Sequence, residues 1–442
     1  MMASVPAKLA MTEEAWKIAN EPAGKTLAFL RFLLRDFHPR DFTIELWDET
    51  RLPAEHAQFS RFTWKICDPA VLKSIFSSSN RQVALAEQYI LGEFDIVGDM
   101  EAIFPLADHL IEKDWSASEL LQVARRLVTL RAAGQNKKGP FAVALRGPRH
   151  EKARDRAAIR YHYDVSNDFY ALWLDKNMLY SSAYFAHPGE DIDSAQINKL
   201  HYICRKLRLK TGERLLDIGC GWGGLMIHAA RHYGVRALGI TLSQAQLQLA
   251  RQRIQEAGLS NRCEVRLLDY RDLPEGDTYD KLVSIGMVEH VGESNLATYF
   301  AKAYRLLRRG GVFLSSGIAR AANRPDSRKS TFTDLYVFPD GELETIGTMV
   351  SSAEQAGFEV RDVESLREHY YLTAIQWLKR LEARAREAQQ IVGDRTYRIW
   401  RLYLAGSAHY FQKAWLNVYQ ILLVKAEKGQ SGLPLRRTDW QL

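Results

Sequence analysis

Hydrophobic and polar positions follow two different patterns along this chain. An amphipathic stretch at 26–35 precedes FTIELWDE and RFTWKICD, in which apolar and polar residues alternate as they do in strands. From residue 213 onward, the apolar runs RLLDIG, RALGIT, EVRLLD, YDKLVSIG and VFLSSG are separated by helix-type repeats. The first pattern predicts a small α+β domain. The second predicts an α/β domain whose mostly parallel sheet has helices on both faces.

Composition between the two patterns places the domain boundary. AAGQNKKGPFAVALRGP, residues 132–148, is rich in Gly, Pro and Lys, as exposed linkers are. We therefore predict an N-terminal lipid-binding or accessory domain over 1–135, a basic linker over 136–155 and a catalytic domain over 156–442. The last domain also contains a helix-type repeat near 372–412, predicted to be a helical insertion between two late strands, FEVRDVES and NVYQILLVKA.

Length and composition narrow the class of protein. The 442 residues suffice for two domains, and no apolar run approaches the ~20 residues that a membrane-spanning helix needs. The first residues lack the apolar core of a signal peptide, so we expect a cytoplasmic protein. The four cysteines are scattered without metal-type or disulfide-type spacing, which predicts reduced thiols and no zinc site: Cys67, Cys204, Cys220 and Cys263.

Positive charge is concentrated in one segment. The net charge is +7, and eleven Lys and Arg residues fall between residues 125 and 160. Such a segment attracts either nucleic acid or an anionic lipid surface, and a solvated linker that binds neither remains an equal alternative. No flipped-base motif of the Asn-Pro-Pro-Tyr type and no recognition module is visible, so we expect no nucleic-acid partner.

A glycine-rich turn predicts the cofactor site. Gly219, Gly221 and the residues around them follow a predicted strand and open a helix, which is the context in which GxGxxG binds a nucleotide-like ligand. Asp217 precedes the turn, where its carboxylate can reach a positive amino group. The second strand ends in Thr241 instead of the acidic residue that a dinucleotide enzyme uses for a ribose hydroxyl. Together with LLDYRDL and LLRRGGVFL, these features favour S-adenosylmethionine.

Further motifs carry a resemblance to a family. YHYDVSNDFYALWLDKNMLYSSAYF, LDIGCGWGG, GITLSQAQ, LDYRD and SIGMVEHVG together resemble the cyclopropane-fatty-acid synthases, from about Arg160 to the C-terminus. The resemblance implies a Rossmann-like, seven-stranded class I methyltransferase domain whose last strand is antiparallel. It also implies the residues that bind S-adenosylmethionine: Tyr180, Ser181, Gly219, Gly221, Gly223, Thr241, Leu242, Gln246 and Tyr270. A helix cap is the alternative role for Thr241, and a solvated first-turn position is the alternative for Gln246.

The same resemblance implies a catalytic group. In this family, a bicarbonate ion is held by the Glu of the EHVG segment together with a Cys, a His, a backbone group and a Tyr. The matching positions here are Glu289, Ser182, Ser316, Ile318 and Tyr370. Serine replaces both the expected Cys and the expected His, and serine donates a hydrogen bond but supplies no imidazolium charge. Bicarbonate is therefore expected to bind more weakly, to bind differently or to be replaced by water.

The implied reaction is methyl transfer to the double bond of an unsaturated acyl chain in membrane phospholipid, closing to a cyclopropane ring. A methyl- or methylene-branched product is the first alternative, followed by a small-molecule methyltransferase and by an inactive lipid-binding relative. The expected partners are phospholipid acyl chains and the anionic inner face of the membrane, with a homodimer as a further possibility that the sequence leaves open. His162 and His290 are candidates for either catalysis or structure, and aromatic residues such as Trp173 and Trp377 for an acyl channel or the core.

Overall fold

The computed structural model describes residues 21–56, 60–130, 145–275, 279–324 and 331–440. Contacts divide the chain into two compact units, Met1–Phe141 and Ala142–Leu442. Residues 136–144 of the basic linker predicted at 136–155 lie outside the described residues, and its end, from Lys152, is the first turn of a helix of the second unit. Within the described ranges, no helix is both long and apolar enough to cross a membrane.

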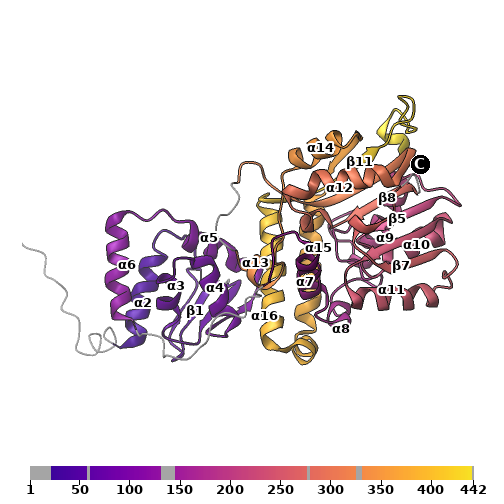
Figure 1. Ribbon diagram of the computed structural model, residues 1–442. Helices are drawn as coiled ribbons and strands as arrows, with labels where there is room; N and C mark the ends of the chain where they lie inside the picture. The colour runs from indigo at the N-terminus through magenta and orange to yellow at the C-terminus, as the bar shows by residue number, and fades with distance from the viewer. Residues whose placement is uncertain (1–20, 57–59, 131–144, 276–278, 325–330, 441–442) are drawn as a thin grey trace, which may run out of the picture. The chain divides into compact units, whose positions relative to one another are not determined.

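The N-terminal unit is a four-stranded sheet with helices (Figure 1). The strand order is β2-β1-β3-β4, with β1 parallel to β3 and the other pairs antiparallel. Strands β1 and β3 fall inside the two alternating segments, where buried Ile44 and Trp64 form one register pair. The elements are α2 (Pro22–Leu33), β1 (Thr43–Glu45), β2 (Arg51–Leu52), β3 (Phe62–Ile66), α3 (Val71–Phe76), α4 (Arg81–Ile90), β4 (Phe94–Gly98), α5 (Phe104–Glu112) and α6 (Ala117–Thr129). The predicted α+β domain is confirmed.

The second unit contains the seven-stranded sheet, in the order β10-β11-β9-β8-β5-β6-β7. Strands β5 to β9 are mutually parallel, and β11 is antiparallel to both of its neighbours, β9 and β10. The fold prediction, including the antiparallel last strand, is therefore confirmed. The strands are β5 (Arg214–Ile218), β6 (Arg236–Thr241), β7 (Cys263–Leu267), β8 (Tyr279–Ile285), β9 (Leu307–Arg320), β10 (Glu359–Ser365) and β11 (Leu416–Val424).

Helices cover both faces of this sheet, as Figure 1 shows. One apolar cluster joins the sheet to α9, α10 and α11, and the other joins it to α12 and α14. The helices are α7 (Lys152–Tyr163), α8 (Asn167–Ala171), α9 (Ile192–Lys206), α10 (Gly224–Tyr233), α11 (Gln244–Glu256), α12 (Glu293–Leu306), α13 (Phe332–Tyr336), α14 (Ile346–Gln355), α15 (Arg367–Ala383) and α16 (Ala385–Gln412). The predicted insertion near 372–412 corresponds to α15 and α16.

One helix boundary differs from the sequence pattern. NLATYFAKAYRLLRRGG reads as one helix through residue 311, but α12 ends at Leu306 and β9 begins at Leu307. Leu307 already has an extended backbone, with φ −89° and ψ 132°, and its side chain is fully buried. The turn into the sheet therefore comes earlier than the apolar spacing indicates.

Candidate active site

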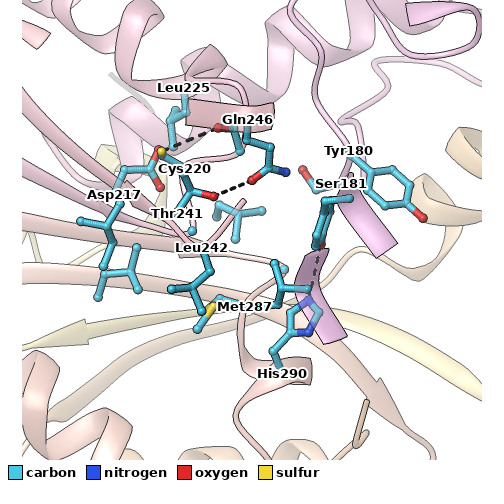
Figure 2. A pocket seen from close by; sticks show the side chains of 18 of the residues that line it. Tyr180, Ser181, Asp217, Cys220, Leu225, Thr241, Leu242, Gln246, Met287 and His290 are labelled. Atoms are coloured by element: carbon cyan, nitrogen blue, oxygen red, sulfur yellow. Dashed lines mark hydrogen bonds between the residues drawn. The ribbon is translucent and has the colours of Figure 1, made fainter. Parts of the chain in front are cut away.

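A cavity lies at the carboxyl ends of β5, β6 and β8, where the strand order reverses around β5. It has a volume of about 1160 Å³ with its open mouth included. Side chains from α7 and α9 complete its wall, and Figure 2 shows how Asp217, Thr241, Gln246 and Met287 surround it. Nine of the ten predicted cofactor residues line this cavity: Tyr180, Ser181, Asp217, Gly219, Gly221, Thr241, Leu242, Gln246 and Tyr270.

The glycine turn brings main chain to the cavity. Gly219 and Gly221 have φ of 84° and 55°, and the amide nitrogens of Gly219 and Cys220 both donate to the Ile240 carbonyl at 3.0 Å. A Cβ atom on Gly221 would meet no protein atom within 4 Å, so that space is available to a ligand. Gly223, the tenth predicted residue, does not line the cavity. It caps α10 with φ 79°, and its Cβ would lie 3.4 Å from that of Ala250 in α11, which gives it a helix-packing role.

Asp217 supplies an uncompensated negative charge. Its side chain ends the buried strand β5 and is 3% exposed, and burial raises the pKa of its carboxyl to about 7. No salt bridge or hydrogen bond to this carboxylate occurs among the described residues. A buried carboxylate in this position suits a ligand that brings a positive group.

Thr241, Leu242 and Gln246 form the next part of the wall. The Thr241 hydroxyl donates to Gln246 Oε1 at 2.7 Å, and it accepts from the Ser243 amide at 3.2 Å. The helix cap is Ser243, whose hydroxyl accepts from the Gln246 amide at 3.1 Å. Thr241 is thus not the helix cap, which was its alternative role. Gln246 is only 5% exposed, so it is not the solvated first-turn residue that was its alternative.

The segment that carries Tyr180 and Ser181 is fixed from both sides. The Tyr180 ring packs 5.2 Å from that of Trp377 and 5.5 Å from that of Trp173, and its hydroxyl donates to Tyr403 at 3.4 Å. Ser181 Oγ accepts from Lys199 Nζ at 2.8 Å. Trp173 and Trp377 are almost fully buried in this aromatic cluster. Of the two roles considered for them, acyl channel or core, this position matches the core.

Glu289 is buried next to the cavity, between the lining residues Met287 and His290. Its Oε1 accepts from the Ile318 amide at 2.7 Å, and its Oε2 has no hydrogen-bond partner. Burial raises the pKa of this carboxyl to about 7. Burial is the main cause that raises the pKa values of Tyr163 and Tyr370. The charge of Glu289 adds to it for both phenols, after that of Tyr403 in the case of Tyr370.

The two serines lie in this region without joining Glu289. Ser182 and Ser316 are 6% and 5% exposed. The Ser182 hydroxyl donates to the Ala183 carbonyl at 3.1 Å, and among the described residues the Ser316 hydroxyl makes no hydrogen bond. The five predicted catalytic residues do not line the cofactor cavity themselves. Glu289 and Ile318 are joined directly, whereas Ser182, Ser316 and Tyr370 make no recorded hydrogen bond to either.

The two histidines are neutral and packed. Burial lowers the pKa of His162 to about 4 and that of His290 to about 3. His162 Nδ1 bonds to the Val337 carbonyl at 2.7 Å, and the His290 ring stacks on Phe338 with centroids 4.3 Å apart. Both contacts are structural, although His290 also lines the cavity beside Tyr163.

Sequence reasoning missed five polar residues of the cavity wall: Asp155, Tyr163, Lys199, Asp269 and Arg271. Asp269 and Arg271 flank Tyr270 in the quoted LDYRD motif, so the motif itself contained the signal. For Lys199 the only sequence signal was the apolar spacing of its helix. Leu200, Ile203 and Cys204 lie on the buried face of that helix, and Lys199 is buried with them.

The residues of this cavity fit S-adenosylmethionine. Main chain is exposed at a glycine turn, Asp217 can meet an ammonium group, and Thr241 and Gln246 offer polar atoms to the nucleoside. Bound there, the cofactor supplies an electrophilic methyl group on a sulfonium. Glu289, beside the cavity, is a buried carboxyl that is able to accept a proton.

Comparisons with known proteins agree with this geometry. The family model described as mycolic acid cyclopropane synthetase matches residues 150–421. A probable fatty acid methyltransferase of Pseudomonas putida is 40% identical over 400 residues, 90% of this chain and 95% of its own. Sphingolipid C9-methyltransferase 1 of Gibberella zeae is 32% identical over 346 residues, 77% of this chain and 64% of its own.

A solved structure gives the same result. Mycolic acid cyclopropane synthase CmaA1 complexed with SAH and CTAB superposes with a TM-score of 0.58 and 32% identity, covering 61% of this chain and 97% of its own. The residues matched by the family model, 150–421, include the glycine turn and Glu289. The chain therefore belongs to the mycolic acid cyclopropane synthetase family and is an S-adenosylmethionine-dependent methyltransferase.

Proposed function

We propose that this enzyme transfers the methyl group of S-adenosylmethionine to a double bond in an unsaturated acyl chain of membrane phospholipid. The observation that carries the proposal is Glu289, a buried carboxylate beside the cofactor cavity with one unpartnered oxygen and a pKa near 7. Methylation of an alkene creates a carbocation, which needs nearby negative charge and a proton acceptor in surroundings that exclude water. A buried carboxylate with one free oxygen meets both needs.

The electron balance of the reaction is simple. The alkene π pair forms the new carbon–carbon bond while the sulfur–methyl bond breaks, which leaves the neighbouring chain carbon positive. Loss of a proton from the new methyl carbon then closes a cyclopropane ring. Glu289 accepts that proton.

A second product is favoured by the contacts around Glu289. The Ile318 amide, which would donate to a bicarbonate ion, donates to Glu289 instead, and the two serines bring no positive charge. Without that ion, the position of the base changes. A proton lost from a chain carbon would leave a methyl-branched alkene, and a hydride shift before proton loss from the methyl would leave a methylene branch.

Deuterium labelling distinguishes the products. Cells that contain one defined unsaturated fatty acid would express the enzyme and receive methionine with a trideuterated methyl group. A ring or a methylene branch retains two deuterium atoms, whereas a methyl-branched alkene retains three. Derivatisation of double bonds then separates the methylene product from the ring. Absence of any labelled fatty acid, from an enzyme that binds its cofactor, would refute acyl methylation.

Glu289→Gln tests the carboxylate. Turnover should fall ~10²-fold or more, since a preorganised charge near the cation is lost. Affinity for S-adenosylmethionine should change less than about threefold, because Glu289 lies outside the cofactor's wall. Glu293→Gln, an exposed carboxylate four residues later, is the matched control and should keep full turnover. Near-normal turnover in Glu289→Gln would overturn its assignment.

Ser182→Cys combined with Ser316→His tests the altered anion site. The double variant should gain bicarbonate stimulation or shift its product toward the ring, because it restores the donors that the family uses. If the unaltered enzyme already makes cyclopropane with full bicarbonate dependence, the serines do not redirect the chemistry.

A further inference from the structure

Charged side chains in the cofactor cavity separate into paired and unpaired groups. Arg271 bonds to Asp155 at 2.8 Å and to Asp269 at 2.6 Å, so both carboxylates beside Tyr270 share one cation as their ion-pair partner. Asp217 and Lys199 line the same cavity, and neither has an ion-pair partner among the residues described. Among the described residues, the cavity thus holds one carboxylate and one amine that form no ion pair.

Lys199 is held in a specific position on α9. Its side chain is 3% exposed, and Nζ donates to Ser181 Oγ at 2.8 Å. One turn earlier, Gln196 Nε2 donates to the Leu179 carbonyl at 3.2 Å and to the Ser181 carbonyl at 3.0 Å. Gln196 therefore already fixes the main chain of this segment, and the amine of Lys199 is not needed for that purpose.

A neutral hydroxyl is a poor sole partner for a buried ammonium. Burial lowers the pKa of Lys199 to about 7, and the charge of Asp175 opposes this shift. Both oxygens of Asp175 accept from main-chain amides, of Asn177 and Leu179, instead of from Lys199. The amine is thus available to an anionic group that enters the cavity.

We propose that Lys199 binds the carboxylate of the methionine part of S-adenosylmethionine, with Asp217 facing the ammonium of the same part. That end of the cofactor is a zwitterion, and the two unpaired charges of the cavity have the complementary signs. The Ser181 hydroxyl is the neighbouring second donor. The inference rests on the family's cofactor and is independent of which acyl product forms.

The test compares two ligands by calorimetry: S-adenosylmethionine and decarboxylated S-adenosylmethionine, which keeps the ammonium and lacks the carboxylate. Lys199→Met should weaken S-adenosylmethionine about 10- to 100-fold, as expected for a lost hydrogen bond to a charged group. It should leave the decarboxylated ligand within about twofold of its original affinity. Asp217→Asn is the matched control and should weaken both ligands, since both carry the ammonium.

Two results would overturn the proposal. An equal loss for both ligands in Lys199→Met would mean that Lys199 acts by supporting the Tyr180–Ser181 segment. If the variant does not fold, the unaltered enzyme still decides, because it must bind S-adenosylmethionine at least tenfold more tightly than the decarboxylated ligand. Equal affinities of the unaltered enzyme for the two ligands would also refute the assignment.

Discussion

Protonation of Asp217 links cofactor affinity to pH. In the empty cavity burial raises the pKa of this carboxyl to about 7, and an ammonium group beside it would lower that pKa. Below pH 7 the protein must then release a proton to bind, so affinity for S-adenosylmethionine should fall as pH drops, by up to about tenfold per unit. Calorimetry between pH 5.5 and 7.5 measures this slope. An unchanged slope in Asp217→Asn would show that another group is responsible.

Gly221 is the position where a side chain should do most harm to binding. Gly221→Val should abolish measurable binding of S-adenosylmethionine, because the new side chain projects into space that the protein leaves open for the ligand. Gly258→Val is the control, since Gly258 also has a positive φ and open surroundings but lies outside the cavity. Binding by Gly221→Val as tight as that of the control would mean that the cofactor lies elsewhere.

At the scale of single residues, local sequence motifs were enough to predict most of the residues that line the cavity. The glycine turn, Thr241 and Gln246 are a few residues from strand ends, so strand prediction also placed them at the cavity. Lys199 is different, because it reaches the cavity from a helix outside the sheet, and no spacing relates it to Asp217. The packing of Gly223 against Ala250 could not be predicted for a similar reason, since Ala250 is distant in sequence.

Among the elements, α7 is joined to the segment that follows β7 through Arg271. Arg271 bonds to Asp155 of α7, to Asp269 and to the His150 carbonyl. Arg271→Met would leave two largely buried carboxylates without their cation, so the free energy of unfolding should fall by ~3 kcal/mol. Arg266→Met removes the exposed pair with Glu264 and should cost ~1 kcal/mol or less. Urea unfolding without cofactor measures both free energies of unfolding. Equal losses in the two variants would contradict this role of Arg271.

Element types could be predicted better than element ends. The strands of the large sheet were recognisable because their apolar runs are short and bounded by turns. The end of α12 was not, since apolar spacing continues from helix into strand across Leu306 and Leu307. Gly393, with φ 79°, interrupts α16, which its polar surroundings in the sequence did not indicate.

Across the whole molecule, part of the basic segment is used internally. Arg149 and Arg154 both bond to Asp340, and Lys152 pairs with Asp272. Arg156 and Arg160 remain exposed on α7. Exposed residues such as these two, and not the whole basic segment, are therefore available to attract an anionic lipid surface.

Charge reversal tests this surface. Arg156→Glu with Arg160→Glu should lower co-sedimentation with anionic vesicles, because each basic residue near such a surface adds ~1 kcal/mol at modest salt. Arg231→Glu with Arg262→Glu changes the net charge equally at exposed positions elsewhere and is the control. Equal effects of the two pairs would point to net charge alone, and equal binding of the unaltered enzyme to neutral vesicles would exclude an electrostatic role.

The contribution of α7 to the cavity also bears on inheritance. Asp155, Ile159 and Tyr163 form part of the cofactor's wall although they precede the first strand of the sheet by about fifty residues. The family match likewise begins at residue 150, just before this helix. Recombination that exchanged the N-terminal unit for another would therefore preserve cofactor binding only if the crossover fell upstream of α7. The part of the chain that must be inherited together for cofactor binding therefore includes α7 as well as the alternating strands and helices from β5 onward.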